Sequence, residues 1–191
     1  MITGVILAAG GSLRLGRPKQ LLIWRQRPLL QHVIDAAAAS SLAEIVVVLG
    51  HEASLISDAL TMPEGARIAH NPNYRSGQAS SLQVGLNALS ADVHAAAILL
   101  SDHPYVSATL IDRVLAGFDP SSAPVVRPIF GDVPGHPVVV ARSEWERWTF
   151  SGDEGARSLL KGSPVRELSI AEAEFVDVDT WDDYEALLER D

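Results

Sequence analysis

The sequence contains no cysteine among its 191 residues. Disulfide bonds, thiolate nucleophiles and cysteine-based zinc sites are therefore excluded, because each of them needs a cysteine sulfur. Basic residues are scarce as well: 15 lysines and arginines stand against 24 acidic residues, and the net charge is −9. Because nucleic acids and anionic membrane surfaces attract clusters of basic residues, and the chain has no such cluster, neither is an expected partner.

Long hydrophobic runs are also missing. The longest ones, such as residues 45–49, are far shorter than the roughly 20 apolar residues that cross a bilayer. The first four residues lack the basic start of a secretion signal. These absences predict a cytoplasmic protein. The hydrophobic fraction of 47% is ordinary for a globular chain, and the length predicts a single domain over residues 1–191.

Short apolar or β-branched runs alternate with longer helical stretches. Strands are expected at residues 5–7, 44–49, 66–69, 95–100, 138–141 and 175–178. Helices are expected at residues 28–39, 53–60, 79–89, 107–115 and 181–189, with short helices near Glu144 and Ala156. This alternation predicts an α/β fold with a mainly parallel sheet. Such sheets bind ligands at the carboxyl ends of their strands, so a site is expected in the loops after residues 7, 69, 100 and 178.

The first of these loops is rich in glycine. Residues 7–22 read LAAGGSLRLGRPKQLL, and Arg14 and Lys19 add two cations to the loop. Glycine lets a backbone approach a phosphate and turn its N–H groups inward. Arg17 follows Gly16 where the Walker pattern needs lysine, and the dinucleotide fingerprint does not fit either. We interpret the segment as a loop that wraps a triphosphate; the alternative is a surface turn with two solvated cations.

The pattern L-A-A-G-x-S-x-R-x-G-x-x-K over residues 7–19 resembles the signature loop of the nucleotidyltransferases of molybdenum cofactor maturation. The resemblance covers nearly the whole chain and implies a Rossmann-like, three-layer nucleotidyltransferase fold. In that family the lysine neutralises charge that develops on the phosphates, which makes Lys19 and Arg14 catalytic candidates. The resemblance assigns these residues of the loop to nucleotide binding: Leu7, Ala8, Ala9, Gly10, Gly11, Arg14 and Lys19.

Residues 71–86, NPNYRSGQASSLQVGL, resemble the second signature of the family. In related cytidylyltransferases the serine of this motif contacts the nucleotide. Ser81 is therefore a nucleotide-binding candidate, and Gly77 would allow the nucleotide to approach closely. The alternative is that Ser80 and Ser81 only cap the helix that follows them.

Two aspartates are candidate ligands of Mg²⁺, which prefers carboxylate, water and phosphate oxygens. Asp102 follows an expected buried strand in the segment LLSDHP and matches the principal metal ligand of the family, where it would also contact the nucleotide and act in catalysis. Asp179, in DVDTWDD, matches a second metal ligand of related cytidylyltransferases, although Trp181 replaces the usual proline. The alternative for Asp102 is a cap on the next helix, for which Ser107 is better placed.

Two more segments resemble parts of the family that lie near the acceptor substrate. Residues 135–138, GHPV, make His136 a candidate for the acceptor pocket, with a partly buried structural histidine as the alternative. Residues 152–157, GDEGAR, make Arg157 a candidate contact for an acceptor phosphate. Its alternative is a cation on a helix surface.

The reaction implied by the resemblance is attack of an acceptor phosphate on the α-phosphorus of a nucleoside triphosphate. A phosphomonoester is ionised near pH 7, since its second pKa is about 6, so no general base is needed. The guanylyl branch has glycine where this chain has Ala9. We therefore expect CTP as the donor, molybdopterin carrying molybdenum as the acceptor, and a molybdoenzyme as a further partner that receives the cofactor. The alternatives are a guanylyltransferase, a nucleotidyltransferase for another small phosphate, and a carrier without activity.

Overall fold

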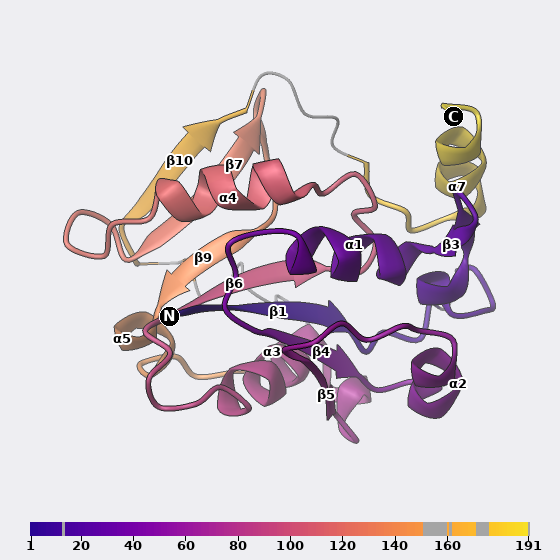
Figure 1. Ribbon diagram of the computed structural model, residues 1–191, viewed down its shortest axis with the longest axis horizontal. Coiled ribbons are helices and arrows are strands. Elements are labelled where there is room, and N and C mark those ends of the chain that lie inside the picture. The colour runs from indigo at the N-terminus through magenta and orange to yellow at the C-terminus, as the bar shows by residue number, and fades with distance from the viewer. Residues whose placement is uncertain (13, 151–159, 161, 171–175, 191) are drawn as a thin grey trace.

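The computed structural model describes residues 1–12, 14–150, 160, 162–170 and 176–190 (Figure 1). The main sheet has the strand order β10-β7-β9-β6-β1-β4-β5. Its strands are β1 (Ile2–Ala8), β4 (Ile45–Leu49), β5 (Ala66–His70), β6 (Ala95–Leu100), β7 (Val125–Phe130), β9 (Val138–Ala141) and β10 (Val165–Ser169), and β8 (Val133–Pro134) pairs with β7. A separate hairpin consists of β2 (Ile23–Trp24) and β3 (Arg27–Pro28).

The α-helices follow the strands along the chain. They are α1 (Leu29–Ala38), α2 (Ala53–Asp58), α3 (Gln78–Asn87), α4 (Ala108–Ala116), α5 (Arg142–Trp145) and α7 (Trp181–Leu188). Two short 3₁₀ turns, η1 (Lys19–Leu21) and η2 (Tyr74–Ser76), precede α1 and α3. Within the described ranges, no helix has the length and apolar character that crossing a bilayer demands.

Parallel pairing brings the ends of the central strands to one edge of the sheet. β1 pairs in parallel with β4 and β6, and Leu7 lies in register with Val48 and Leu100. β4 pairs in parallel with β5, whereas β9 is antiparallel to both β6 and β7. The loops that follow β1, β4, β5 and β6 therefore lie close together. The predicted α/β fold with a mainly parallel sheet is confirmed.

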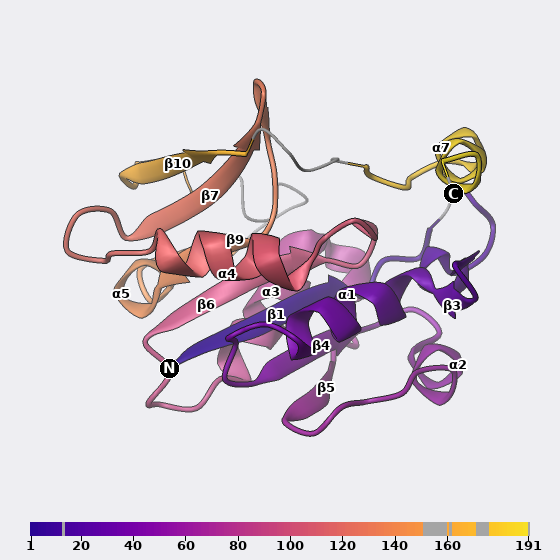
Figure 2. The ribbon, with the colours of Figure 1, turned by 45° about the horizontal axis from the view of Figure 1, so that its top comes forward.

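Helices cover both faces of the sheet, which gives three layers (Figures 1 and 2). On one face, Ile34 of α1 and Ile111 of α4 are buried in a cluster with Val47 of β4. On the other face, Leu82 of α3 is buried in a second cluster with Val48. Neighbouring residues of a strand point to opposite faces, so a strand covered on both sides is apolar throughout, as β4 is.

The C-terminal helix α7 is held against the segment that follows the first loop. Leu187 and Val178 are buried in a cluster with Trp24 and Leu29, and the Tyr184 hydroxyl donates a hydrogen bond to the carbonyl of Ile23 at 2.6 Å. The two views show α7 beside β3. Residues 176–180 are thereby brought to the edge of the sheet where the first loop lies.

The sequence-based elements differ from the structure in several places. The strand expected at residues 175–178 does not form over the described residues 176–178, which run as a connecting segment. β7 and β10 were not expected. Pro128 within β7 argues against a strand on sequence grounds, and β10 lies at the end of the sheet order with mostly exposed side chains, so its hydrophobic pattern is weak. The short helix expected near Ala156 lies outside the described residues.

Gly85 allows α3 to lie directly on the sheet. A β-carbon at Gly85 would lie 2.5 Å from Val5 Cγ1 and 3.0 Å from Val48 Cγ2. We expect Gly85→Ala to lower the free energy of unfolding by about 1–3 kcal/mol, because overpacking outweighs the better helix propensity of alanine. The matched control is Gln83→Ala on the exposed side of α3, expected to change it by less than about 0.5 kcal/mol. Equal urea-denaturation midpoints for the two variants would contradict this packing.

Candidate functional site

The first loop is shaped by two polar side chains. The buried amide of Gln20 donates hydrogen bonds to the carbonyls of Ala8 at 2.9 Å and Gly10 at 3.1 Å. The Ser12 hydroxyl accepts a hydrogen bond from the backbone N–H of Lys19 at 3.0 Å. These bonds join the start of the loop to its end. Sequence reasoning missed Gln20, because nothing in the local pattern shows that its amide reaches backbone groups ten or more residues earlier.

A pocket of about 270 Å³ opens beside this loop, between the ends of β1 and β6 and the start of α3. Seven of the residues assigned to the nucleotide from the sequence line it: Leu7, Ala9, Gly10, Lys19, Gly77, Ser81 and Asp102. Lys19 and Asp102 provide charged groups, while Leu7 and Ala9 are apolar. The lining also includes Arg75, and it mixes polar and charged side chains with apolar ones, as suits a ligand that carries phosphate groups.

The other residues expected to bind the nucleotide lie elsewhere. The Ala8 side chain is buried in the cluster beneath α1, although its carbonyl accepts a hydrogen bond from Gln20. Arg14 is exposed and is not among the residues that line the pocket. Gly11 lines a different, larger pocket. Arg14 and Gly11 therefore do not line the smaller pocket.

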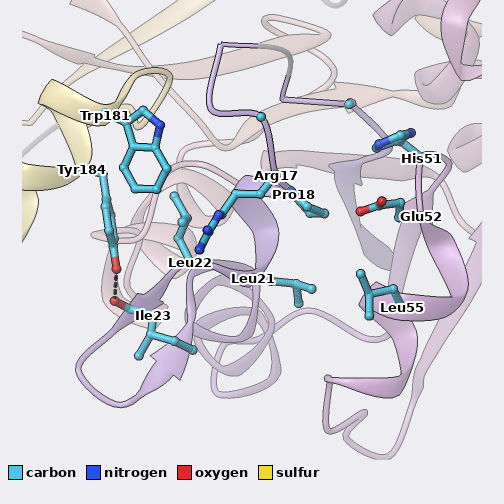
Figure 3. Close-up of a pocket in the computed structure, with 12 residues that line it drawn as sticks. Arg17, Pro18, Leu21, Leu22, Ile23, His51, Glu52, Leu55, Trp181 and Tyr184 are labelled. Carbon is cyan, nitrogen blue, oxygen red and sulfur yellow. Dashed lines mark hydrogen bonds between the residues drawn. The ribbon is translucent and has the colours of Figure 1, made fainter.

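The larger pocket has a volume of about 750 Å³. Its lining comes from the first loop, from α2 and from α7. In Figure 3, Arg17 and Pro18 lie between Trp181 and Tyr184 on one side and His51 with its neighbours on the other. The Arg17 guanidinium lies 5.6 Å from the centroid of the Trp181 ring. Neither Lys19 nor Asp102 belongs to the lining, so the smaller pocket is the better candidate for a triphosphate.

Ser81 and Gly77 occupy the start of α3. The Ser81 hydroxyl is buried and accepts a hydrogen bond from the Asn71 amide at 2.9 Å. Gly77 is the N-cap residue, with a φ of 108° that favours glycine, and no side chain caps the helix. The Ser80 hydroxyl instead donates to the carbonyl of Gly77 at 2.8 Å. The capping alternative for Ser80 and Ser81 is therefore wrong.

A half-buried ion cluster lies at the mouth of the smaller pocket. The Lys19 ammonium donates hydrogen bonds to Oδ2 of Asp102 and, at 2.8 Å, to Oδ1 of Asp179. Arg14 donates to Oδ2 of Asp179 at 3.3 Å. Burial opposes the charge of Lys19, yet attraction to Asp102 and hydrogen bonds to both carboxylates raise its pKa overall. The cluster thus joins the first loop, the end of β6 and the segment before α7.

Asp102 does not cap the helix that follows it. Ser107 holds that position, and its hydroxyl accepts a hydrogen bond from the backbone N–H of Leu110 at 3.1 Å. The backbone carbonyl of Asp102 accepts a hydrogen bond from the N–H of Val178 at 3.2 Å. The carboxylate of Asp102 is directed to the ion cluster.

Two residues that sequence reasoning did not select, His103 and Asp177, complete the cluster. Their ligand atoms and a carboxylate oxygen of Asp102 all lie within 4.8 Å of one another. Burial lowers the pKa of His103, and the charge of Lys19 adds to this effect. Partial loss of water around its carboxylate, with the charges of Asp102 and Asp179, raises the pKa of Asp177 to about 6, although the residue as a whole is exposed. Four acids crowd residues 177–183, and the sequence alone does not show which of them face Asp102.

The two candidates for the acceptor differ in what the structure shows. His136 is half-buried, its Nδ1 lies 3.0 Å from the carbonyl of Ile98, and its ring is 5.5 Å from the ring of His103. His136 thus lies next to the ion cluster and also has a backbone partner, so both interpretations of this residue stay open. Arg157 lies outside the described residues.

Three relatives resemble this chain over most of their length. The nicotine blue oxidoreductase of Paenarthrobacter nicotinovorans is 34% identical over 171 residues, which are 85% of this chain and 83% of that protein. The molybdenum cofactor cytidylyltransferase of Escherichia coli K12 is 26% identical over 191 residues, 97% of this chain and 95% of that protein. The crystal structure of Rv0371c from Mycobacterium tuberculosis H37Rv is 33% identical, with a TM-score of 0.86 over 98% of this chain and 97% of that chain.

The same mycobacterial protein in complex with manganese has a TM-score of 0.81 at 30% identity, and 98% of each chain is covered. The family described as MobA-like NTP transferase domain matches residues 4–170. This range contains the first loop, the start of α3 and Asp102. The Rossmann-like nucleotidyltransferase fold implied by the sequence motifs is confirmed, and the chain belongs to the MobA-like NTP transferase domain family, as a nucleotidyltransferase.

Proposed function

We propose that the chain transfers CMP from CTP to the terminal phosphate of molybdopterin carrying molybdenum, which releases pyrophosphate and gives a cytosine dinucleotide cofactor. The observation that carries this proposal is the pocket beside the first loop, with Lys19 and Asp102 together at its mouth. The similarity to the cytidylyltransferase of Escherichia coli, which extends over 97% of the chain, supports the choice of reaction.

Positioning and electrostatics would supply the catalysis. The acceptor phosphate is its own nucleophile, so the protein has to align it with the α-phosphorus and stabilise the charge that develops on the phosphates. Lys19 is the group best placed for the second task, because its ammonium is fixed by two carboxylates. Arg14, which is exposed and bonded to Asp179, would turn to the phosphates when the triphosphate binds.

Asp102 and Asp179 would hold Mg²⁺, which when bound supplies positive charge to the phosphate oxygens. Both carboxylates face the same Lys19 ammonium, so they already converge on one cation. Among the described residues, Oδ1 of Asp102 is buried and has no hydrogen-bond partner, so protein donors do not saturate this carboxylate and it keeps capacity for metal binding. The manganese complex of the mycobacterial relative supports a divalent cation of some kind.

The choice of CTP rests on Ala9. Its side chain is buried and lines the pocket. The wall behind it is tight: a β-carbon at Gly50 would lie 2.9 Å from Ala9 Cβ and 2.6 Å from Tyr74 Cβ. Ala9 is thus packed closely against Gly50 and Tyr74, and its methyl group takes space in the pocket. We propose that the pocket therefore accepts a pyrimidine better than a purine.

The acceptor would lie beyond the ion cluster, toward His136, with Arg157 as a proposed contact for its phosphate, and a molybdoenzyme would receive the product. Two other functions are less well supported. A carrier without activity needs no lysine fixed between two metal-binding carboxylates. A redox activity like that named for the Paenarthrobacter relative would need a site for an electron donor, and the first loop does not match the dinucleotide fingerprint.

Nucleotide preference can be measured by thermal unfolding with Mg²⁺ and each of CTP, GTP, ATP and UTP. A ligand at about 100 times its dissociation constant adds about 2.7 kcal/mol to the free energy of unfolding. We expect a rise of several degrees with CTP and a clearly smaller one with GTP. In Ala9→Gly the difference between CTP and GTP should shrink, because the methyl group that narrows the pocket is gone. Equal shifts with CTP and GTP in the unaltered protein would refute the preference.

The variant Asp102→Asn distinguishes an enzyme from a carrier that binds the cofactor without activity. We expect CMP transfer, followed as pyrophosphate release, to fall by about 10²–10³-fold, because the Mg²⁺ that would stabilise charge on the phosphates loses an anionic ligand. The matched control is Glu64→Gln, which removes an exposed carboxylate just before β5, away from the carboxyl edge of the sheet, and should leave the rate unchanged. Full transfer activity in Asp102→Asn would rule out this role for Asp102.

A further inference from the structure

The two carboxylate oxygens of Asp102 face different partners. Oδ2 accepts a hydrogen bond from the Lys19 ammonium, which also contacts Asp179. Oδ1 lies 3.8 Å from Nε2 of His103, too far for a hydrogen bond. Within the described part of the chain, this oxygen is buried and has no hydrogen-bond partner. A buried carboxylate oxygen without a partner is costly, so the arrangement points to a ligand that completes it.

We propose that Asp102, His103 and Asp177 form a second divalent-cation site, which the protein itself holds and which selects a first-row transition ion over Mg²⁺. This site lies at Oδ1 of Asp102, whereas the Mg²⁺ of the proposed reaction would lie between Asp102 and Asp179. Asp102 would then bridge the two positions. The inference does not depend on which nucleotide or acceptor the chain uses.

The distances suit an ion with small side-chain movements. Two ligand atoms bonded to one ion at about 2.1 Å lie about 3–4 Å apart. The candidate ligand atoms lie within 4.8 Å of one another, and Oδ1 of Asp102 and Nε2 of His103 are already 3.8 Å apart. Asp177 is exposed and can turn toward the other two, whereas the side chain of His103 is only 9% exposed.

The backbone holds these three residues in place. Asp102 and His103 follow β6 almost directly, and the N–H of Ser101 donates a hydrogen bond to the carbonyl of Leu7 at 3.2 Å. The N–H of Val178 donates to the carbonyl of Asp102 at 3.2 Å, which places Asp177 beside it. The site is therefore built on the central strand β6 and tied to the segment before α7, and it does not rely on the first loop.

The imidazole decides which ion the site prefers. Mg²⁺ takes oxygen ligands and gives up its water reluctantly, so a buried nitrogen ligand adds little to its binding. First-row transition ions accept imidazole nitrogen readily, and the two carboxylates supply the negative charge that any dication needs. We therefore expect Mn²⁺ to bind more tightly than Mg²⁺, and we choose Mn²⁺ as the probe because its unpaired electrons report on the ligand atoms.

The test uses the full chain, stripped of metal and without nucleotide. Mn²⁺ binding is followed by the loss of the free-ion signal in electron paramagnetic resonance, and the ligand atoms are identified by pulsed measurements of nitrogen coupling. We expect one saturable site with nitrogen coupling, which changes to the ¹⁵N pattern when the histidines carry ¹⁵N. A hundredfold excess of Mg²⁺ should leave most of the Mn²⁺ bound. Displacement by that excess, or absence of nitrogen coupling in the unaltered chain, would overturn the proposal.

Variants then identify the histidine. His103→Leu should abolish the nitrogen coupling and weaken Mn²⁺ binding by more than about tenfold, since loss of even an outer partner of a metal ligand costs about 10–100-fold. His70→Gln, at an exposed position of β5, and His136→Leu, beside His103, should both keep the coupling. Coupling that depends on His136 and persists in His103→Leu would refute the assignment. If His103→Leu does not fold, the ¹⁵N measurement on the unaltered chain still decides whether a histidine is a ligand.

The outcome of this test is independent of the outcome of the test of the proposed function. A chain that shows nitrogen coupling with Mn²⁺ but no thermal shift with any nucleotide would contradict the proposed transfer and leave this site standing. A chain that prefers CTP but binds Mn²⁺ through oxygen atoms alone would retain the transfer and lose this site.

Discussion

The candidate site depends on one interaction, the contact of the Lys19 ammonium with Asp102 and Asp179. The side chains of Lys19 and Asp102 are only 14% and 15% exposed, and a charge so far from water needs an opposite charge close by. Removal of Lys19 would leave the carboxylates of Asp102 and Asp179 close together without a positive charge between them. The contact joins three segments that are distant in the sequence: the first loop, the end of β6 and the residues before α7.

The fold supplies what this contact needs. Parallel pairing of β1 with β6 places the first loop next to Asp102, and the packing of α7 on the hairpin segment brings Asp179 to the same place. The result is a concentration of acids in a chain whose net charge is already −9. An anionic substrate can bind there only with local positive charge, which Lys19, Arg14 and a divalent cation would provide. The raised pKa of Asp177 is a sign of the same crowding.

The relatives show how little the fold alone says about chemistry. A cytidylyltransferase and a protein named as an oxidoreductase resemble this chain over most of its length. Function in such a family is decided by a few side chains at the carboxyl edge of the sheet. In this chain the informative ones are Ala9, which lines the pocket, and His103, whose imidazole lies beside the carboxylate of Asp102.

The sequence by itself determined the features that are local. The apolar run of β4 and the alternation of strands with helices predicted the layered α/β fold, and the spacing of the first loop identified Lys19, because a signature motif is contiguous. The position of an acid just after β6 made Asp102 a candidate in the same way. Hydrophobic periodicity and motif spacing are properties of neighbouring residues, so they can be read without the fold.

The tertiary structure decided what depends on distant segments. Gln20 holds backbone carbonyls of the first loop, and Asp177 lies beside His103 only because α7 packs on residues that follow that loop. The expected strand at residues 175–178 was wrong for the same reason: the apolar Val178 is buried by α7 and the hairpin segment, and it does not pair within the sheet. Which acids of a crowded run face one another is settled by packing between segments more than 70 residues apart, and no local pattern records it.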